Sequence, residues 1–269
     1  MSDLSRTHEY GRSLTADAWC KAWYKHATGD KNPELPDLPA ANIQQITNNI
    51  SGGPTIRGAA RLYRVLDDEI RLTMEGDPAS WRVLDYGAGW GRITRLMLRT
   101  TPPDKLFAFD VDKKLVASAR KLLPGIRFAH AEPGQQLPFT DGFFDVVYAN
   151  SVLSHLSREA HEFCLSEASR MLRPGGIFIG TTLGESHYEL WSRNPRQRAW
   201  ITGLVGTPRE FRRKLRNGRF IFGSTGRWKD YGIAILPKEW PEQHWPAFGL
   251  NPLHTRTDYS QNVIIARKL

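Results

Sequence analysis

Residues 83–92 read VLDYGAGWGR, and this stretch decides which fold we predict. A short apolar strand runs into closely spaced glycines, and a helical pattern follows from Gly91 to Arg99. Glycine permits a sharp turn and lets a ligand approach the backbone closely. The start of a helix presents N–H groups and a partial positive charge to a bound group. The stretch therefore predicts a ligand site at the end of a buried strand.

An acidic residue follows at the distance that a nucleoside site requires. Asp110 ends the next apolar run, roughly 20 residues after the turn, where a carboxylate can accept hydrogen bonds from both ribose hydroxyls. The glycines are spaced G-x-G-x-G, whereas dinucleotide enzymes prefer G-x-G-x-x-G. Asp85, just before the loop, suits a cationic ligand and disfavours a pyrophosphate. The pattern favours S-adenosylmethionine, which carries a sulfonium and an α-amino group, over a dinucleotide.

Short apolar runs alternate with helical patterns along the middle of the chain. The runs are 83–84, 106–109, 126–129, 144–149 and 177–182. Helical spacing at 113–123 and 158–172 separates some of them, and two closing strands are expected at 250–257 and 262–268. Such alternation is typical of α/β proteins. We predict a Rossmann-like, doubly wound seven-stranded sheet, mostly parallel with an antiparallel final strand.

Four motifs in order resemble the class I S-adenosylmethionine-dependent methyltransferases. The first two are Asp85-x-Gly87-x-Gly89-x-Gly91, which looks like motif I of that family, and the acid Asp110. The others are LPF at 137–139 followed by FDVV at 144–147, and LRPGG at 172–176. The resemblance covers about residues 80–182 and extends loosely to the closing strands. It implies S-adenosylmethionine as cofactor and S-adenosylhomocysteine as product.

The resemblance also implies which residues bind the cofactor. The expected residues are Asp85, Gly87, Ala88, Gly89, Asp110, Val111, Glu132, Asn150 and Ser151. Glu132 is the acid nearest to the adenine position, although its register is off by about one residue and Pro133-Gly134 departs from the family's usual sequence. Asn150 and Ser151 follow the fourth strand, where the family lines the space around the methyl group.

Two histidines are the candidates for catalysis. Methyl transfer to a hydroxyl needs a general base, whereas a carboxylate acceptor needs none. His155 and His187 follow the fourth and fifth predicted strands. His155 can equally form part of the wall of the cofactor pocket, and His187 can be a solvated loop residue. The acceptor-side candidates are Tyr188, Arg193 and Tyr231.

The positive charge of the chain is concentrated in one segment. The net charge is +9, and the stretch from Glu185 to Asp230 holds eleven Lys or Arg and four Asp or Glu. This segment is either a solvated surface or a binding surface for an anionic small-molecule or glycan acceptor. An RNA or DNA methyltransferase is an alternative, but residues 149–152 lack the Asn/Asp-Pro-Pro-aromatic motif used for base amino groups. A catalytically inactive binding protein is the other alternative.

The remaining features bear on organisation and location. We expect a helical lid region at 1–75 and a methyltransferase domain at 76–269, with a basic, irregular insertion at 183–231 after the fifth strand. The two cysteines, Cys20 and Cys164, lie far apart and suggest no zinc site or disulfide framework, so no metal is expected. No apolar run approaches the roughly 18 residues of a membrane span, and the polar N-terminus has no signal-peptide core. We therefore expect a cytoplasmic protein without a membrane partner; the oligomeric state stays open.

Overall fold

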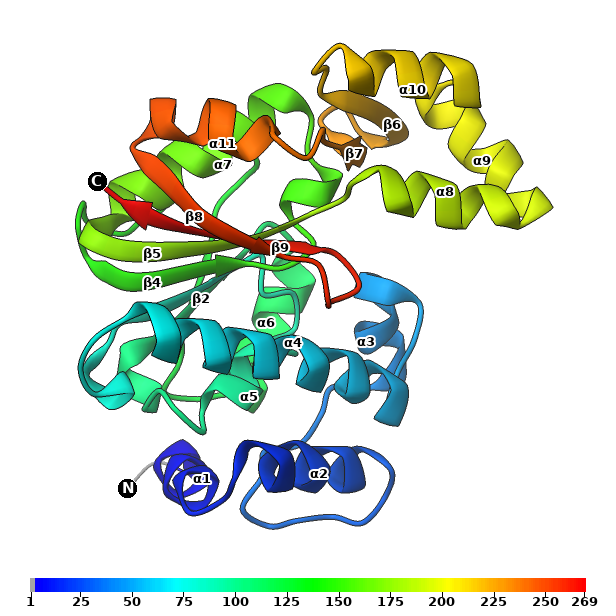
Figure 1. The fold of residues 1–269 in the computed structure, drawn as a ribbon. Coiled ribbons are helices and arrows are strands. Elements are labelled where there is room, and N and C mark those ends of the chain that lie inside the picture. Colours follow the sequence, from blue (N-terminus) through cyan, green and yellow to red (C-terminus); the bar gives the residue numbers. More distant parts are fainter. Residues whose placement is uncertain (1–2) are drawn as a thin grey trace. The chain divides into compact units, whose positions relative to one another are not determined.

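The computed structural model describes residues 3–269, and its contacts divide the chain into two compact units. The first unit ends at Tyr148, and the second is Ala149–Leu269. The first unit holds the N-terminal helices and the glycine-rich loop, and the second holds the basic segment (Figure 1). The division into a lid region and a methyltransferase domain at residue 75 stays a prediction.

A seven-stranded sheet has the strand order β3-β2-β1-β4-β5-β9-β8. Strand β1 is parallel to β2 and β4, and β2 is parallel to β3, whereas β9 is antiparallel to β5 and β8. The predicted sheet, mostly parallel with an antiparallel final strand, is confirmed. The strands are β1 Val83–Tyr86, β2 Leu106–Asp110, β3 Arg127–His130, β4 Phe144–Ala149, β5 Leu172–Thr182, β8 Leu250–Arg256 and β9 Asn262–Lys268.

Burial explains why these apolar runs form strands. Every residue of β1 and β2 is buried, as expected for strands of a parallel sheet that is covered on both faces. The three phenylalanines Phe107, Phe139 and Phe144 pack edge to face at one end of this core. The carboxyl ends of β1 and β2 therefore lead directly from a rigid core into the glycine-rich loop and Asp110.

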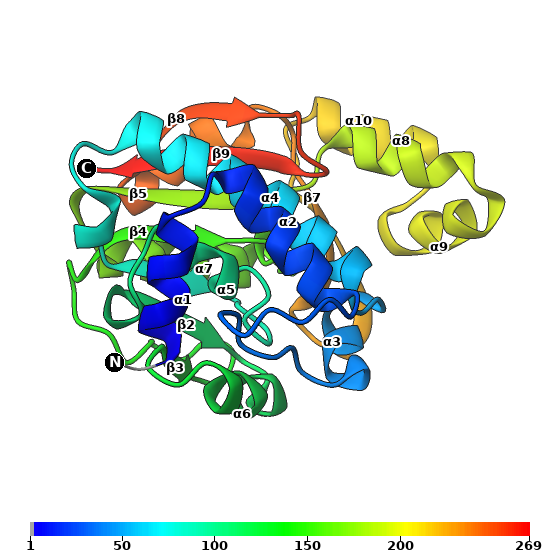
Figure 2. The same cartoon turned by 90° about the horizontal axis from the view of Figure 1, so that it is seen from below.

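Four helices precede the sheet in the first unit. They are α1 Asp3–Arg12, α2 Ala16–Ala27, α3 Ala41–Asn48 and α4 Gly53–Thr73. Helix α2 lies along α4 (Figure 2), and the indole N–H of Trp19 donates to Leu96 O at 2.9 Å. The helical character expected for residues 1–75 is thus present in the described part of that range.

The helices that follow β1, β2 and β4 differ in how well they match the expectation. They are α5 Thr94–Met97, α6 Lys113–Leu122 and α7 Arg158–Met171, and the Ser157 side chain caps the start of α7. Short 3₁₀ turns lie at Pro78–Ser80, Pro103–Lys105, Leu153–His155 and Trp245–Phe248. The helix expected from Gly91 is much shorter than predicted, because Gly91 has a φ of 78° and a right-handed helix needs a negative φ.

The basic segment is regular, so the prediction of an irregular insertion was wrong. It forms α8 Glu185–Arg193, α9 Pro195–Val205, α10 Pro208–Arg216, β6 Ile221–Trp228 and β7 Tyr231–Ile235, and β6 and β7 make a separate antiparallel sheet. These elements share a hydrophobic core that includes Ile201, Phe211 and Ile233. A last helix, α11 Trp240–His244, precedes β8.

Candidate active site

The glycine-rich loop of the first unit is fixed by backbone hydrogen bonds. The N–H groups of Gly87 and Ala88 both donate to Phe109 O at 2.9 Å, and Gly89 N–H donates to Asp110 Oδ2 at 2.7 Å. Gly87 and Gly89 have φ values of 80° and 58°. A Cβ on Gly89 would lie 2.9 Å from Thr47 Cγ2. The loop is therefore a formed recess that only glycine fits without strain.

Asp110 retains acceptor capacity for a nucleoside. Its Oδ1 accepts from Asp112 N–H at 2.8 Å, and its Oδ2 accepts from Gly89 N–H. Burial raises the pKa of this carboxyl above its usual value. Each carboxylate oxygen has a second lone pair, so Asp110 can accept two further hydrogen bonds from ribose hydroxyls. The residues at the end of β2 thus fit the ribose of S-adenosylmethionine.

Asp85 has a different environment from the one that the sequence suggested. Its side chain is 1% exposed, and Oδ2 accepts from Thr94 Oγ1 at 2.6 Å. Burial raises the Asp85 pKa to about 6. The carboxylate fastens the loop to α5, so its contacts favour a positioning role over direct contact with a cation.

A buried arginine supports the loop and was missed in the sequence. The Arg95 guanidinium donates to Trp90 O at 3.2 Å and to Gly91 O at 3.1 Å, and it lies 4.9 Å from the centroid of the Trp90 ring. Its position four residues after Gly91, beside the apolar residues Leu96 and Met97, was the available signal. Arg95 thus stabilises the loop by donating hydrogen bonds to two of its carbonyl groups from a buried position.

Two further predicted cofactor residues, Val111 and Glu132, follow β2 and β3. Val111 is half-buried. The Glu132 side chain is 52% exposed, and its carboxylate lies 2.9 Å from Lys113 Nζ, which lowers the Glu132 pKa. The carboxylate of Glu132 is therefore already paired, and its contact with adenine stays a prediction.

In the second unit, the segment after β4 contains a buried polar atom that has no hydrogen-bond partner in the described chain. Ser151 has a φ of 57°, its N–H donates to Thr181 Oγ1 at 2.7 Å, and its Oγ accepts from Gln261 Nε2 at 2.8 Å. Asn150 Oδ1 and Gln261 Oε1 are buried and have no hydrogen-bond partner among residues 3–269. A non-glycine residue with positive φ is uncommon and often marks a functional site. Thr181 and Gln261 were missed, because their contacts span 30 and 110 residues.

His155 lies in the same unit with one ring nitrogen fixed. Its Nδ1 is 2.8 Å from Gly232 O, which can only accept, so Nδ1 carries the proton. The ring stacks on Tyr231 with centroids 5.1 Å apart. Burial lowers the His155 pKa, so the ring is neutral and Nε2 is the basic nitrogen. Nε2 makes no hydrogen bond within the described chain. The structure thus brings His155 and Tyr231 together.

The candidates after β5 are engaged in structural contacts. His187 Nδ1 accepts from Gly184 N–H at 3.2 Å, and Nε2 donates to Ser260 O at 2.6 Å, so neither nitrogen is free to take a proton. Tyr188 is 2% exposed and stacks on Phe211 with centroids 3.8 Å apart. Arg193 is exposed. These contacts favour structural roles for His187 and Tyr188.

The described residues contain neither a cluster of metal ligands nor a membrane-spanning helix. Residues 3–269 contain no group of three or more His, Cys, Asp or Glu arranged to hold a metal ion. Cys20 and Cys164 are buried free thiols. Among the described helices, none combines the length and the apolar character needed to cross a membrane.

Comparison with known proteins identifies the class of the chain. Residues 83–176, from β1 into β5, match the family described as a methyltransferase domain. This range contains the glycine-rich loop and Asp110, and the sheet order is that of a Rossmann-like methyltransferase. Residues 83–176 therefore form a methyltransferase domain on a Rossmann-like sheet, and S-adenosylmethionine is the cofactor of this domain.

Individual relatives resemble parts of the chain. Trans-aconitate 2-methyltransferase of Acidovorax sp. (strain JS42) is 31% identical over 50% of this chain and 52% of its own length. Malonyl-[acyl-carrier protein] O-methyltransferase of Methylococcus capsulatus is 29% identical over 48% of this chain and 47% of its own length. The chain thus spans about half the length of the curated relatives it matches.

A solved structure has a similar fold. CalS10 from Micromonospora echinaspora, an amino pentose methyltransferase with S-adenosylmethionine bound, gives a TM-score of 0.52 at 17% identity. The match covers 78% of this chain and 91% of that chain. At this identity the likeness shows the fold.

Proposed function

We propose that this chain transfers a methyl group from S-adenosylmethionine to an oxygen atom of a small anionic acceptor, with His155 as general base. The observation that carries the proposal is the hydrogen bond from His155 Nδ1 to Gly232 O. It fixes the tautomer that leaves Nε2 as a proton acceptor, and burial keeps the ring neutral. A neutral, oriented imidazole is the group that a hydroxyl acceptor requires.

The roles of the protein residues follow from their contacts. S-adenosylmethionine supplies the methyl group on a sulfonium, which is already an activated leaving group. Asp110 orients the ribose through its two remaining lone pairs, and Asn150 Oδ1 accepts a hydrogen bond that the chain itself does not provide. His155 Nε2 takes the proton of the acceptor hydroxyl, while stacking on Tyr231 keeps the ring in place. Most of the remaining rate enhancement comes from positioning.

The names of two relatives and the charge of the basic segment support an oxygen atom of an anionic acceptor, whereas the choice of a hydroxyl over a carboxylate oxygen rests on His155 alone. One relative is named an O-methyltransferase of malonyl-[acyl-carrier protein], and another is named for trans-aconitate. The basic segment supplies many exposed arginines, and guanidinium groups bind carboxylates and phosphates in bidentate fashion. We therefore infer that the acceptor carries a negative charge, and that Arg193 is one of its contacts.

The test uses a substitution that removes only the base. Formation of S-adenosylhomocysteine is measured with a panel of hydroxylated and carboxylated anions. In His155→Asn, the amide N–H can replace Nδ1 as donor to Gly232 O, but no basic nitrogen remains. We expect kcat to fall by about 100-fold or more, with S-adenosylhomocysteine affinity unchanged. His187→Gln keeps a donor toward Ser260 O and should leave kcat nearly unchanged.

The pH profile gives a second readout of the same role. Because burial holds the His155 pKa below 6.5, kcat should be constant above that pH and should fall at lower pH as the ring is protonated. His155→Asn should lack this acidic limb. A kcat that survives in His155→Asn would remove the base from the mechanism and would favour a carboxylate acceptor.

A further inference from the structure

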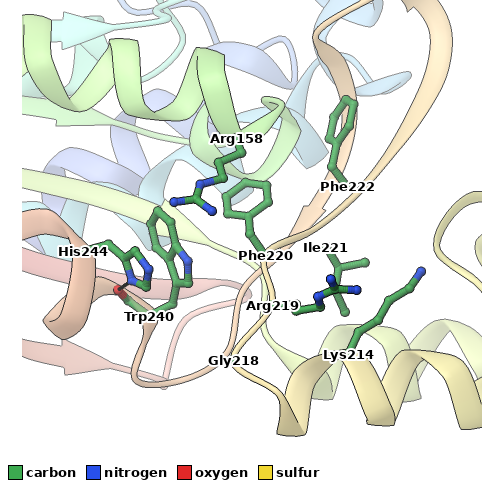
Figure 3. Close-up of a pocket in the computed structure, with 9 residues that line it drawn as sticks. All are labelled: Arg158, Lys214, Gly218, Arg219, Phe220, Ile221, Phe222, Trp240 and His244. Carbon is green, nitrogen blue, oxygen red and sulfur yellow. Dashed lines mark hydrogen bonds between the residues drawn. The ribbon is translucent and has the colours of Figure 1, made fainter.

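The second unit contains a pocket that shares no residue with the individually named cofactor and acceptor candidates, although part of its lining belongs to the basic segment. Its volume is about 330 Å³, which lies at the lower end of the range for small-molecule sites. It is lined by the first turn of α7, the last turns of α10, residues 218–222 and α11 (Figure 3). Nothing in the proposed methyl transfer uses it.

Three cations line this pocket, and none of the lining residues is acidic. Arg158 Nε donates to Glu162 at 2.7 Å, and Lys214 Nζ donates to Val205 O at 3.0 Å. The Arg219 guanidinium makes no hydrogen bond to any side chain or backbone group of residues 3–269. Like charges around one hollow repel each other, and a bound anion would relieve that repulsion.

Aromatic side chains form the other part of the wall. His244 stacks on Trp240 with centroids 4.3 Å apart and an interplanar angle of 8°, and Phe220 meets Trp240 at 5.3 Å. In Figure 3 the Trp240–His244 pair and Phe220 lie on the same side of the pocket as Arg158, whereas Lys214 projects from α10. Cations and aromatic faces together suit a ligand with both an anionic group and a ring.

A fully buried histidine makes this wall rigid. His161 is 0% exposed and touches Phe220 and Trp240 edge to face, at 5.4 and 5.1 Å. The Trp240 side chain itself is 1% exposed. The aromatic part of the pocket is therefore anchored in a packed core, so a ligand would not need to order it on binding.

We propose that this pocket binds an aromatic phosphate monoester. The phosphoryl group would lie against Arg219 and Arg158, which can each offer two N–H donors to its oxygens. The ring would pack beside Phe220 and His244. A dianionic phosphate balances more of the local positive charge than a single carboxylate does, and this favours a phosphate over a carboxylate ligand.

The outer side of α10 provides a matched control. Arg209, Glu210, Arg212, Arg213 and Arg216 line a separate hollow of about 430 Å³ that has no aromatic residue in its lining. Arg216 and Arg219 carry the same charge, are both exposed and lie three residues apart in sequence. Removal of either arginine changes the net charge equally, but only Arg219 lines the aromatic pocket.

The experiment is calorimetric titration of the whole chain, saturated with S-adenosylhomocysteine, with phenyl phosphate, inorganic phosphate and phenol. We expect phenyl phosphate to bind at one site per chain, inorganic phosphate to bind more weakly, and phenol not to bind. Arg219→Ala should weaken phenyl phosphate binding by about tenfold or more, and Arg216→Ala should leave it nearly unchanged. Phe220→Leu should remove the advantage of phenyl phosphate over inorganic phosphate.

Other outcomes would overturn the proposal. Equal losses in Arg216→Ala and Arg219→Ala would mean that phenyl phosphate is attracted by overall charge rather than by this pocket. No binding of phenyl phosphate would remove the site. S-adenosylhomocysteine affinity is measured in the same samples, so failure of the pocket is distinguishable from failure of the methyltransferase assignment.

Discussion

The glycine-rich loop and the segment after β4 show two different ways to prepare a site. In the loop of the first unit, Gly87, Ala88 and Gly89 donate to Phe109 O and Asp110, so these backbone groups are satisfied before any ligand binds. In the segment after β4 of the second unit, Asn150 Oδ1 and His155 Nε2 have no partner in the described chain. The backbone N–H groups of Gly87, Ala88 and Gly89 are thus paired without a ligand, whereas we expect a ligand to pair the free acceptors of the segment after β4.

The largest effect is expected from a substitution that disrupts the glycine-rich loop. In Gly89→Val, the side chain must adopt a φ of 58° and would clash with Thr47 Cγ2. We expect S-adenosylhomocysteine affinity to fall by about 100-fold or more. Gly203→Val is the control, because it lies in α9 and a Cβ there meets nothing within 4 Å. Calorimetry measures affinity, and thermal unfolding checks that both variants fold; wild-type affinity in Gly89→Val would refute the site.

Asp110→Ala tests whether stability and binding depend on the same group. The substitution removes the acceptor of Gly89 N–H and of Asp112 N–H, so both donors lose their partner. We expect a destabilisation of about 1–3 kcal/mol and an affinity for S-adenosylhomocysteine that is about tenfold to 100-fold lower. Denaturant unfolding and calorimetry measure the two quantities. A loss of stability without a loss of affinity would show that Asp110 only supports the loop.

His161 sharpens the comparison, because an unpaired polar atom does not by itself mark a site. Both of its ring nitrogens lack a partner among residues 3–269, and aromatic rings surround it. Burial lowers its pKa to about 3 from 6.5 in the unfolded chain. The unfolded state therefore binds more protons below pH 6.5, and folding stability is lost as the pH falls from 6.5 toward 3.

His161→Phe should remove this dependence. At pH 5 the wild-type chain should lose about 2 kcal/mol relative to pH 7.5 through this residue, and the variant should not. Denaturant unfolding at both pH values gives the difference, in which the other titrating groups cancel. S-adenosylhomocysteine affinity should stay unchanged. Equal pH dependence in the two proteins would mean that His161 is protonated in the folded state.

The two regions also differ in how far the sequence predicted them. The positions of Gly87, Gly89 and Asp110 could be predicted from the sequence, because they depend on local backbone conformation and on the end of a strand. The partner of His187 lies 73 residues away, and the partner of Ser151 lies 110 residues away. No local sequence pattern predicts such long-range hydrogen bonds. These bonds determine which histidine keeps a ring nitrogen that can accept a proton.

The basic segment was mispredicted for another reason. Thr207 accepts from Glu210 N–H, and the Glu210 side chain accepts from Thr207 N–H, which forms a capping box with Pro208 in the first turn. The T-P-R-E sequence that encodes this box was visible, and Phe211 and Leu215 follow at helical spacing. The number of charged residues concealed a local signal that was sufficient to predict α10.

The smallest expected effect is also the one that separates the two regions most directly. Asn150→Leu removes a buried acceptor that has no partner in the described chain and replaces it with an apolar group of similar size. We expect the ligand-free protein to be unchanged or to gain up to about 1 kcal/mol in stability, while its affinity for S-adenosylhomocysteine falls. Asp110→Ala should lower both quantities. If Asn150→Leu also lowered stability, the Asn150 side chain would stabilise the ligand-free fold. The contrast between the two regions would then fail.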